Sequence, residues 1–285
     1  MMNQSKPEMK DRKDSPEGFV DIHTHLVPGV DDGAACIEDS YQMLNQAWES
    51  GTAVLAATPH VYPGVQKDKE IEGLLQARDQ WVEYASKKFP QVHLMAGAEI
   101  HCTHDLYRVL SHFGSRLALN GGSYVLLEFP FDMLFPGVDE LLFLLQKNGW
   151  IPVIAHPERN AVIQRNPEVL SRMVSAGALA QVNTGSLAGW FGEAPRRSAV
   201  QLLRRNLVHV VASDAHWPGE RPADLSGVPT VLEELGLTDP DWLLRRNPWR
   251  VLQNKELEPM PELNPQPEND GGLFSRLVRH LRNNW

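Results

Sequence analysis

Short apolar runs that end beside polar, metal-binding side chains recur seven times along the chain. Each run is rich in small and branched apolar residues, a composition typical of buried strands in a parallel sheet. The runs and the polar residues that follow them are residues 19–22 with His23 and His25, 53–57 with His60, 92–98 with Glu99, 124–127 with Glu128, 151–155 with His156, 178–182 with Asn183, and 207–212 with Asp214 and His216. In a barrel of parallel strands the carboxyl ends meet at one rim, so we expect these residues to lie together.

Segments with helical spacing separate these runs. The expected helices cover residues 37–50, 67–88, 138–148, 167–176, 195–206 and 228–235. Four of them end at a glycine, where a left-handed cap forms most easily. Strands that alternate with helices predict parallel pairing with crossover helices, and hence one α/β barrel domain over residues 18–256.

The two ends of the chain differ from the rest in composition. Residues 1–17 are polar with charges of both signs, so we expect a disordered tail. Residues 257–272 are rich in Pro, Glu and Asn and are expected to form a linker. Residues 273–285 have apolar positions at helical spacing with arginines between them, which predicts a basic amphipathic helix. That helix either packs on the barrel, which is usual for so short an element, or docks a partner or lipid.

Composition and charge exclude several classes of function. The formal net charge of -9 disfavours nucleic acid and anionic membrane as partners, since both repel an acidic surface. The two cysteines, Cys36 and Cys102, are too few for a disulfide framework or a thiolate zinc site. The longest apolar stretches fall short of the ~18 residues that a membrane span requires. We expect a cytoplasmic protein with no membrane span, and an oligomer is compatible with the sequence.

The residues at the strand ends form a set suited to metal ions. His23 and His25 are two residues apart, so strand alternation places both imidazoles on one face. A single histidine at a strand end is more often structural, and only the joint placement indicates metal. The nine candidate ligands are His23, His25, Asp32, His60, Glu99, Glu128, His156, Asp214 and His216.

The charge of this set favours three divalent ions. Nine ligands are too many for one or two ions at usual coordination numbers. The four carboxylates leave three divalent ions with a surplus of about two positive charges, which matches a phosphate dianion. The ligands offer only nitrogen and oxygen, which suits manganese, iron or zinc.

The segments around these ligands resemble the PHP (polymerase and histidinol phosphatase) superfamily. The matching segments are His-x-His at 23–25, Pro-His at 59–60, Gly-Ala-Glu-Ile at 97–100, Leu-Glu-Phe at 127–129, Ile-Ala-His-Pro-Glu-Arg at 154–159 and Ala-Ser-Asp-Ala-His at 212–216. Within that superfamily, residues 21–26 followed by Val-Asp-Asp-Gly at 30–33 resemble the bacterial manganese-dependent tyrosine-protein phosphatases of capsule and exopolysaccharide gene clusters. The resemblance spans roughly residues 19–253 and covers all seven strand ends in order.

The resemblance implies a distorted seven-stranded (β/α)7 TIM-like barrel that holds three ions, with Mn2+ expected and Fe or Zn as alternatives. It implies that the first ion binds His23, His25, Glu99 and Asp214, that Glu99 bridges to a second ion held with Glu128 and His156, and that the third binds Asp32, His60 and His216. Arg159 and Arg221 match the family's phosphate-binding arginines.

The implied activity is hydrolysis of phosphotyrosine on a protein, most simply a tyrosine autokinase that controls polysaccharide export. A hydroxide that bridges two ions is the expected nucleophile, with arginines holding the non-bridging oxygens. A tyrosyl leaving group has a pKa near ~10 and needs little protonation. Asp214 and His216 are the candidate proton donors if metal does not fully engage them.

Other functions stay open on the sequence alone. The same site could hydrolyse a small phosphomonoester such as histidinol phosphate, or a phosphodiester as in PHP exonucleases. A regulatory scaffold with a vestigial metal site is a non-enzymatic alternative, although a decayed site would have lost some ligands. Residues 101–108 match the H-C-x5-R pattern of thiol-dependent tyrosine phosphatases, but they lack the glycines that cradle phosphate, and we interpret the match as coincidence.

Several neighbours of the expected site have two interpretations. Arg159 and Arg221 could instead form surface ion pairs with the adjacent glutamates. Asn183 is expected to donate a hydrogen bond rather than bind metal. Trp190 and Phe191, in an expected loop over residues 184–194, either form an aromatic wall for the substrate ring or pack on the barrel.

Overall fold

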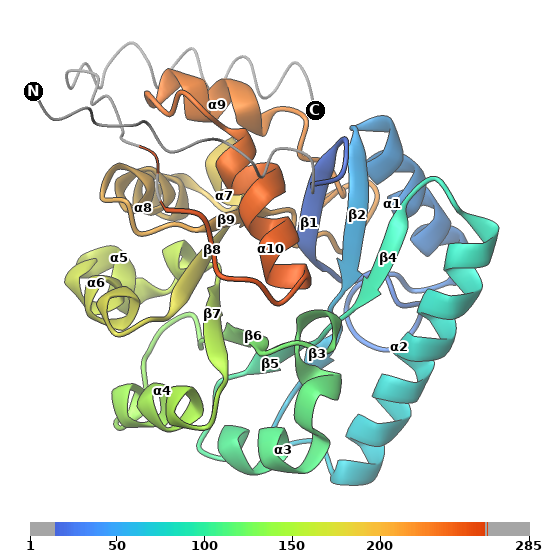
Figure 1. Ribbon diagram of the computed structural model, residues 1–285, viewed down its shortest axis with the longest axis horizontal. Helices are drawn as coiled ribbons and strands as arrows, with labels where there is room; N and C mark the ends of the chain where they lie inside the picture. Colours follow the sequence, from blue (N-terminus) through green and yellow to red (C-terminus); the bar gives the residue numbers. More distant parts are fainter. Residues whose placement is uncertain (1–14, 260, 262–285) are drawn as a thin grey trace, which may run out of the picture.

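Parallel strands and helices alternate along the chain in the computed structural model, which describes residues 15–259 and residue 261 (Figure 1). The strands are β1 (Phe19–Thr24), β2 (Thr52–Ala57), β3 (His60–Val61), β4 (His93–Ala96), β5 (Glu99–His101), β6 (Tyr124–Glu128), β7 (Ile151–Ala155), β8 (Leu179–Asn183) and β9 (Val210–Ala212). They form a three-stranded sheet in the order β1-β2-β4 and a six-stranded sheet in the order β3-β5-β6-β7-β8-β9. Every pair of neighbouring strands is parallel.

The strand count differs from the expected seven, and the strands form two parallel sheets in which no closed barrel is shown. Seven runs were expected, but two of them are each broken into two short strands, so the described residues contain nine strands in two sheets. The second run becomes β2 and β3, and the third becomes β4 and β5. Each broken run therefore contributes one strand to each sheet.

Pro59 and Gly97 lie at the two breaks. Pro59 has no N–H to donate to a ladder and restricts the residue before it, so β2 cannot continue through it. A Cβ on Gly97 would lie 2.9 Å from Leu119 and 3.0 Å from Thr58, so only glycine permits this close approach. Gly97 N still donates to Ala57 O at 2.9 Å, and Glu99 N donates to Pro59 O at 3.2 Å. The chain therefore bends at these points while neighbouring segments stay bonded.

The two sheets share one apolar cluster. It joins residues of β1 and β2 with residues of β6, β7 and β9, for example Ile22, Val54, Leu126 and Val210. Alternation sends the other side chains of the same strands outward, as Val125 does in β6. Beyond β9, Asp214 N donates to His23 O at 2.9 Å and His25 N donates to Ala215 O at 2.8 Å. These bonds tie the far edge of the six-stranded sheet to β1.

Helices cover the outer faces of both sheets. They are α1 (Ile37–Glu49), α2 (Asp68–Lys88), α3 (Leu106–Phe113), α4 (Val138–Lys147), α5 (Ala161–Arg165), α6 (Glu168–Ser175), α7 (Thr184–Ala188), α8 (Glu193–Arg204), α9 (Val228–Glu234) and α10 (Asn247–Leu252), with the π-helix η5 (Trp242–Arg246) before α10. α1 and α2 pack on the three-stranded sheet, and α10 covers the end of the shared cluster (Figure 1). All six expected helices are present with ends within two residues of the expected bounds.

The buried face and the first turn of α2 both follow from its sequence. Its buried side chains include Ile71, Leu75, Trp81 and Ala85, which recur at helical spacing and face the sheet. The carboxylate of Glu70 accepts a hydrogen bond from Lys67 N at 2.7 Å, which satisfies a free N–H at the first turn.

The predicted tail and C-terminal helix lie outside the described residues, apart from residues 15–17. The first residues of the predicted linker, in contrast, contact the body of the protein: Glu258 N donates to Asn247 Oδ1 at 3.1 Å, and Arg246 Nε donates to Glu258 Oε2 at 2.7 Å. None of the helices in the described part of the chain has the length and apolar character needed to cross a bilayer.

Candidate metal centre

The bends and strand ends bring all nine predicted ligands into one cluster. The register pairs His60 with Glu99 across β3 and β5, and His101 with Glu128 across β5 and β6. Eight of the nine side chains are buried, and Asp32, in the loop after β1, is exposed. Residues that are up to 193 positions apart in the chain, His23 and His216, thus share one site.

The first expected group meets at close range. His23 Nε2 lies 3.2 Å from Glu99 Oε2 and 3.4 Å from Asp214 Oδ1. His25 Nε2 lies 3.2 Å and 3.5 Å from the same two oxygens. The ligand atoms of these four residues all lie within 4.8 Å of one another. This arrangement can hold one ion.

Glu99 also faces the positions expected for the second ion. Its Oε1 lies 2.9 Å from His156 Nε2, which in turn is 3.7 Å from Glu128 Oε1. His60 Nδ1 lies 3.0 Å from Glu99 Oε2, and the ligand atoms of His60, Glu99 and Glu128 form a second compact group. Glu99 therefore has one oxygen toward each of two groups, as expected of a bridging carboxylate.

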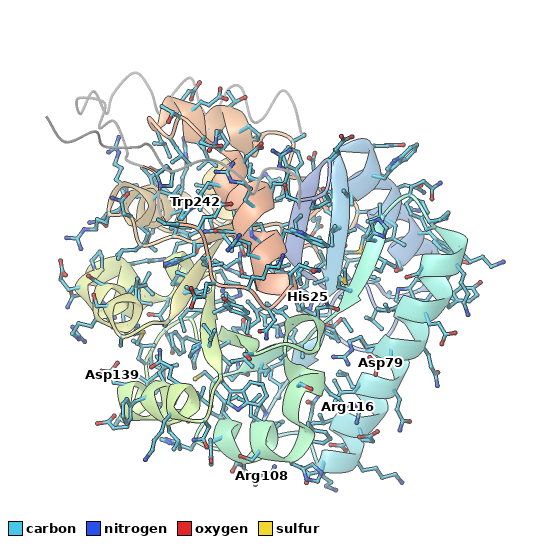
Figure 2. The ribbon with its side chains drawn as sticks, viewed as in Figure 1. His25, Asp79, Arg108, Arg116, Asp139 and Trp242 are labelled. Carbon is cyan, nitrogen blue, oxygen red and sulfur yellow. The ribbon has the colours of Figure 1, made fainter. Side chains whose placement is uncertain are left out.

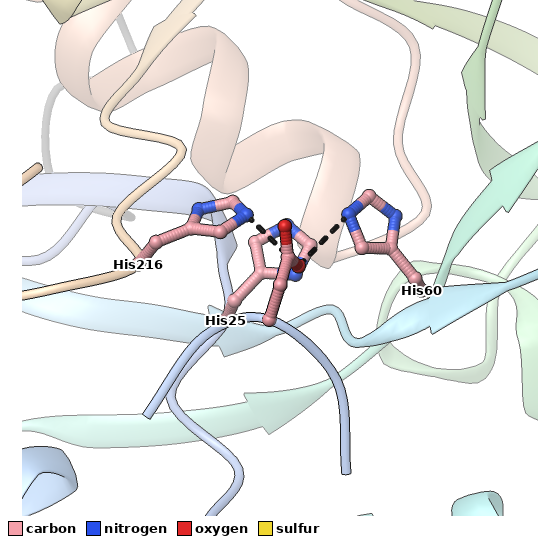
Figure 3. A group of neighbouring side chains, drawn as sticks. His25, His60 and His216 are labelled. Carbon is pink, nitrogen blue, oxygen red and sulfur yellow. Dashed lines mark ion pairs between the residues drawn. The ribbon is translucent and has the colours of Figure 1, made fainter. Parts of the chain in front are cut away.

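The third group gathers around Asp32. Its Oδ1 lies 3.4 Å from His60 Nε2 and 3.3 Å from His216 Nε2, and the dashed lines in Figure 3 mark ion pairs in this group. His25 joins the same compact set. His60 and His25 thus each lie between two of the three groups.

The donor set fits divalent cations. Glu99 Oε2 and His60 Nδ1 are buried and have no hydrogen-bond partner among the described residues. His23 Nε2 and His25 Nε2 face each other 3.2 Å apart. Each Nδ1 faces an oxygen acceptor, of Gln181 and Asp31 respectively, so in the neutral rings both Nε2 atoms would be acceptors. Nitrogen and carboxylate oxygen are ligands that manganese, iron and zinc accept. A cation between these atoms would satisfy all of them.

Without metal, protonated imidazoles balance the carboxylates. Burial disfavours the charged form of His23, but Glu99 and Asp214 outweigh it and raise its pKa to about 9. The same opposition, dominated by Glu99 and Asp32, raises the pKa of His60 to about 12. Burial alone would favour a neutral Glu99, yet the surrounding imidazoles hold its pKa well below its usual range. Glu99 is therefore ionised, which is the form of a carboxyl group that binds a cation.

Asp31 orients two of the ligand residues. Its Oδ2 lies 2.8 Å from His25 Nδ1 and accepts from His60 N at 3.1 Å. A carboxylate on Nδ1 leaves Nε2 of His25 free to bind metal. Gly33 lets this loop approach, because a Cβ there would lie 2.0 Å from His25 O. The close contact with His25 is therefore what requires glycine at this position.

A chain of amides supports the opposite side of the cluster. His23 Nδ1 lies 2.9 Å from Gln181 Oε1, and Gln181 Nε2 donates to Asn183 Oδ1 at 2.8 Å. Asn183 Nδ2 donates to Asp214 Oδ2, which is the donor role expected for it. Gln181 was not singled out in the sequence, since nothing marks a glutamine inside an apolar strand as part of a site.

Two of the predicted ligands have left-handed backbone. His156 has a φ of 31° and Asp214 a φ of 53°. Non-glycine residues rarely adopt this conformation, and it is found most often at functional sites. At the ends of β7 and β9 it turns these side chains toward the cluster, in place of the alternation that a continued strand would impose.

Arg159 and Arg221 both face the cluster. They line a cavity of about 280 Å³ together with Asp32, His60, Tyr62, Glu99, His101, Glu128, Phe131, His156, Asp214 and His216. Arg159 Nη1 lies 3.4 Å from Asp214 Oδ2, and Arg221 Nη2 donates to the same oxygen. A turn in which Arg221 N donates to Trp217 O at 3.1 Å places the second arginine there. The alternative of surface ion pairs with adjacent glutamates is therefore wrong.

Two aromatic rings, Phe131 and Phe191, contact the guanidinium of Arg159. The Arg159 guanidinium lies 4.4 Å from the ring centroid of Phe131 and 4.2 Å from that of Phe191. Trp190 packs beside Gly185 in α7, where a Cβ would lie 2.7 Å from its ring. Phe191 also packs beside Gly185, at 2.9 Å from such a Cβ, so both rings pack against the protein, and part of the expected loop is the helix α7.

His101 lies at the cavity wall. Its Nδ1 is 3.2 Å from Glu128 Oε2, and its ring centroid lies 5.7 Å from that of Tyr62. Neither Tyr62 nor Phe131 was identified from the sequence. Their only signal was that each lies within a few residues of an expected strand end.

The thiol pattern at residues 101–108 does not form a site. Cys102 is buried, and burial raises the pKa of its thiol to about 12, so a thiolate is not available. Arg108 Nη1 pairs with Asp68 Oδ1 at 2.9 Å on the surface, and Figure 2 shows it at the outer edge of the molecule, away from His25. The interpretation of this match as coincidence is confirmed.

Comparison with known proteins identifies the family of this chain and solved structures with a similar fold. The sequence pattern of the family described as capsular polysaccharide synthesis, CpsB/CapC, matches residues 19–253. Tyrosine-protein phosphatase YwqE of Bacillus subtilis is 37% identical over 256 residues, which cover 90% of this chain and 99% of that protein. Tyrosine-protein phosphatase CpsB of Streptococcus pneumoniae is 32% identical over 216 residues, which cover 72% of this chain and 85% of that protein.

Two solved structures share the fold. A chain from the crystal structures of YwqE from Bacillus subtilis and CpsB from Streptococcus pneumoniae, described as metal-dependent tyrosine phosphatases, has a TM-score of 0.76 and 35% identity. The match covers 87% of this chain and 99% of that one. A β-aspartyl dipeptidase from Fervidobacterium islandicum has a TM-score of 0.50 at 13% identity and covers 84% of this chain. The second likeness concerns the fold alone.

Proposed function

The chain belongs to the CpsB/CapC family of capsular polysaccharide synthesis, and we propose that it is a metal-dependent tyrosine-protein phosphatase. Relatives that match nearly all of their own length carry that activity in their names. The observation that carries the proposal is the joint position of nine nitrogen and oxygen ligands and two arginines around one cavity. This arrangement combines cation binding with phosphate binding.

In the proposal, three groups of side chains hold the ions: His23, His25, Glu99 and Asp214, then Glu99, Glu128 and His156, then Asp32, His60 and His216. Bound divalent ions lower the pKa of water and offset the charge of the phosphoryl group. Manganese is the expected metal for two reasons. The phosphatases that the sequence resembles depend on manganese, and the candidate ligand atoms are nitrogen and oxygen.

Arg159 and Arg221 bind the phosphoryl oxygens in this proposal. A guanidinium donates parallel N–H groups in one plane, which matches two oxygens of a phosphate. Asp214 Oδ1 faces His23 and His25, and Asp214 Oδ2 faces the two arginines. It therefore anchors both arginines beside the ion that it would help to hold.

In the metal-free protein, the pKa directions disfavour protonation of both predicted proton donors. Burial would raise the pKa of Asp214, but His23 and Arg221 hold it well below its usual range. Burial, with the charge on His25 next, lowers the pKa of His216. A tyrosyl oxygen with a pKa of about 10 can leave with little protonation, so the reaction does not depend on either residue as an acid.

The cavity suits a phosphate with part of an aromatic ester. Its volume of about 280 Å³ lies just below the range of sites for whole drug-sized ligands. Tyr62 and Phe131 at its wall can contact a phenyl ring. The proposal extends to a tyrosine autokinase as substrate and to a cytoplasmic location, both of which rest on the family resemblance. A small phosphomonoester is the weaker alternative, and a scaffold without activity is weaker still because all nine ligands are in place.

One assay tests the proposal. Protein stripped with chelator is offered p-nitrophenyl phosphate and a phosphotyrosine peptide, with and without manganese. We expect no turnover without metal and recovery on addition of manganese. His156→Ala should abolish the recovered activity, and Arg159→Ala should lower kcat/KM about 100-fold, the usual loss for one oriented donor.

Cys102→Ser is the control for the thiol alternative, and it should keep the activity of the parent. Turnover that resists chelation would contradict the metal mechanism. Hydrolysis of p-nitrophenyl phosphate with no hydrolysis of any phosphopeptide would favour a small-molecule substrate.

A further inference from the structure

Arg159 is held between two aromatic rings. Its guanidinium carbon lies 4.4 Å from the centroid of the Phe131 ring and 4.2 Å from that of the Phe191 ring. The same Phe191 ring lies 5.4 Å from the guanidinium carbon of Arg221. The Phe191 ring therefore contacts both arginines, and the Phe131 ring contacts Arg159 and lies 5.8 Å from the ring of His156.

Three successive strands supply this arrangement. Phe131 follows β6, Arg159 follows β7, and Phe191 follows β8 and α7. The first two segments are joined by short bonds: Ala161 N donates to Phe131 O at 2.6 Å, and Asn160 Nδ2 donates to Pro130 O at 2.6 Å. The backbone at Pro130 and Phe131 is thus bonded to the segment that directly follows Arg159.

Gly185 fixes the position of the second ring. A Cβ at this residue would lie 2.9 Å from the Phe191 ring and 2.7 Å from the Trp190 ring. Trp190 N donates to Gly185 O at 2.9 Å, which closes the turn after α7. The segment that carries Phe191 is therefore packed tightly against the helix before it.

Contact with aromatic faces leaves the guanidinium donors free. Among the described residues Arg159 has one hydrogen-bond acceptor, Asp214 Oδ2 at 3.4 Å, which is a long contact. The rings attract the cation through their faces and accept none of its in-plane N–H groups. A side chain with this many free donors would otherwise occupy many rotamers, and ordering it on binding would cost affinity.

We propose that Phe131 and Phe191 are positioning residues that hold the plane of the Arg159 guanidinium ready for a phosphoryl group. The inference rests on the proposed phosphatase function. Phe131 is 45% exposed, so the fold does not need it as core. Its role is to restrict the arginine before substrate arrives.

The test is a double-mutant cycle on the manganese-loaded protein. Phe131→Leu keeps an apolar side chain but removes the aromatic face. We expect kcat/KM for p-nitrophenyl phosphate to fall about threefold to fivefold, the size of one partly exposed cation–π contact. Phe131→Tyr, which keeps the ring, should lose much less. In an Arg159→Ala background, Phe131→Leu should lower kcat/KM by less than about twofold, because the residue through which it acts is gone.

Phe191→Leu provides a second comparison. Phe191→Leu should lower kcat/KM about tenfold in the parent protein. In the Arg159→Ala background it should still lower kcat/KM, by a smaller factor, because Phe191 also contacts Arg221. The affinity for inorganic phosphate, measured by calorimetry, should follow the same pattern without any turnover. Phe143→Leu, an exposed phenylalanine of α4 that does not line the cavity, is the matched control and should match the parent.

The possible outcomes separate the inference from the function. If the parent protein hydrolyses no phosphoester with manganese, the proposed function is wrong. If the parent is active but Phe131→Leu has no effect, or has the same effect with and without Arg159, the positioning role is wrong. Loss of bound manganese in Phe131→Leu would also overturn it, since the effect would then arise at the metal centre.

Discussion

Asp31 shows how one carboxylate can organise ligands from two strands. It is two residues from Gly33 in the loop after β1, and its Oδ2 contacts both His25 Nδ1 and the backbone N of His60. A neutral imidazole such as that of His25 has two tautomers, which differ in the ring nitrogen that carries the proton. A fixed carboxylate on one ring nitrogen selects the tautomer in which the other nitrogen can bind metal.

Asp31→Asn is therefore expected to weaken manganese binding. The change keeps the size of the side chain but removes the charge that holds the His25 ring, and losses of about 10- to 100-fold are typical for partners of metal ligands. Calorimetric titration of chelator-treated protein with manganese measures the affinity.

The matched control is Asp139→Asn, at an exposed aspartate in the first turn of α4. It should bind manganese as the parent does. Equal affinities in the Asp31 variant and the parent would show that His25 needs no orienting partner.

At the scale of elements, periodicity in the sequence identified the strands and most helices, because apolar spacing directly reflects the buried face. It did not identify the break at Gly97, which depends on how close Leu119 and Thr58 approach, or the break at Pro59 that separates β2 from β3. The short helices α5, α7 and α10 were also missed, because five or six residues are too few to display a period. The left-handed backbone at His156 and Asp214 has no sequence signal either, as neither residue is glycine.

His209 links β8 to the start of β9 and makes this connection sensitive to acid. Its Nδ1 accepts a hydrogen bond from Ala180 N at 3.1 Å, and its own N donates to Ala180 O at 2.9 Å. Burial lowers the pKa of His209 from its ordinary value of 6.5 to about 4. The folded protein thus binds this proton less readily than the unfolded chain does.

The sign of the pH dependence follows from that difference. The contribution of neutral His209 to stability is complete above pH 6.5 and is lost as pH falls toward 4. The loss amounts to about 3 kcal/mol at most, at 1.36 kcal/mol for each pKa unit. His209→Gln keeps an acceptor for Ala180 N without titrating. Urea unfolding between pH 7 and 4 should show the parent losing stability relative to this variant.

His93→Gln, at an exposed position at the start of β4, is the control for a general effect of removing a histidine. Its stability should follow the pH profile of the parent. A constant difference between the parent and His209→Gln at every pH would mean that His209 does not titrate on unfolding.

At the scale of the whole molecule, the site draws on both sheets and on loops from residue 23 to residue 221. Placement at strand ends predicted this convergence from sequence, because parallel topology leaves few alternatives. The supporting residues were harder to predict. Gln181 and Phe131 matter through contacts that only the folded chain defines.

Metal should therefore stabilise the fold as a whole. Manganese at about 100 times its dissociation constant contributes about 2.7 kcal/mol to a protein that binds it only when folded. For a chain of this size that corresponds to a rise in Tm of about 5–10 °C. Differential scanning calorimetry with manganese and with chelator measures it. An unchanged Tm would mean that the cluster does not bind the ion in the folded state.

Binding should also release protons. The raised pKa values of His23 and His60 mean that both hold protons at pH 7 in the metal-free chain, and ligation requires their loss. Calorimetric titrations in buffers of different ionisation enthalpy would detect the release.

The bond between the segment after β9 and β1 has a consequence for the order of events during synthesis. His23 and His25 leave the ribosome early, but their backbone partners, Asp214 and Ala215, follow roughly 190 residues later. β1, β2 and β4 can pair well before then. A nascent chain thus carries an incomplete set of the candidate ligands through most of its translation, and the proposed metal centre can form only when nearly the whole fold has assembled.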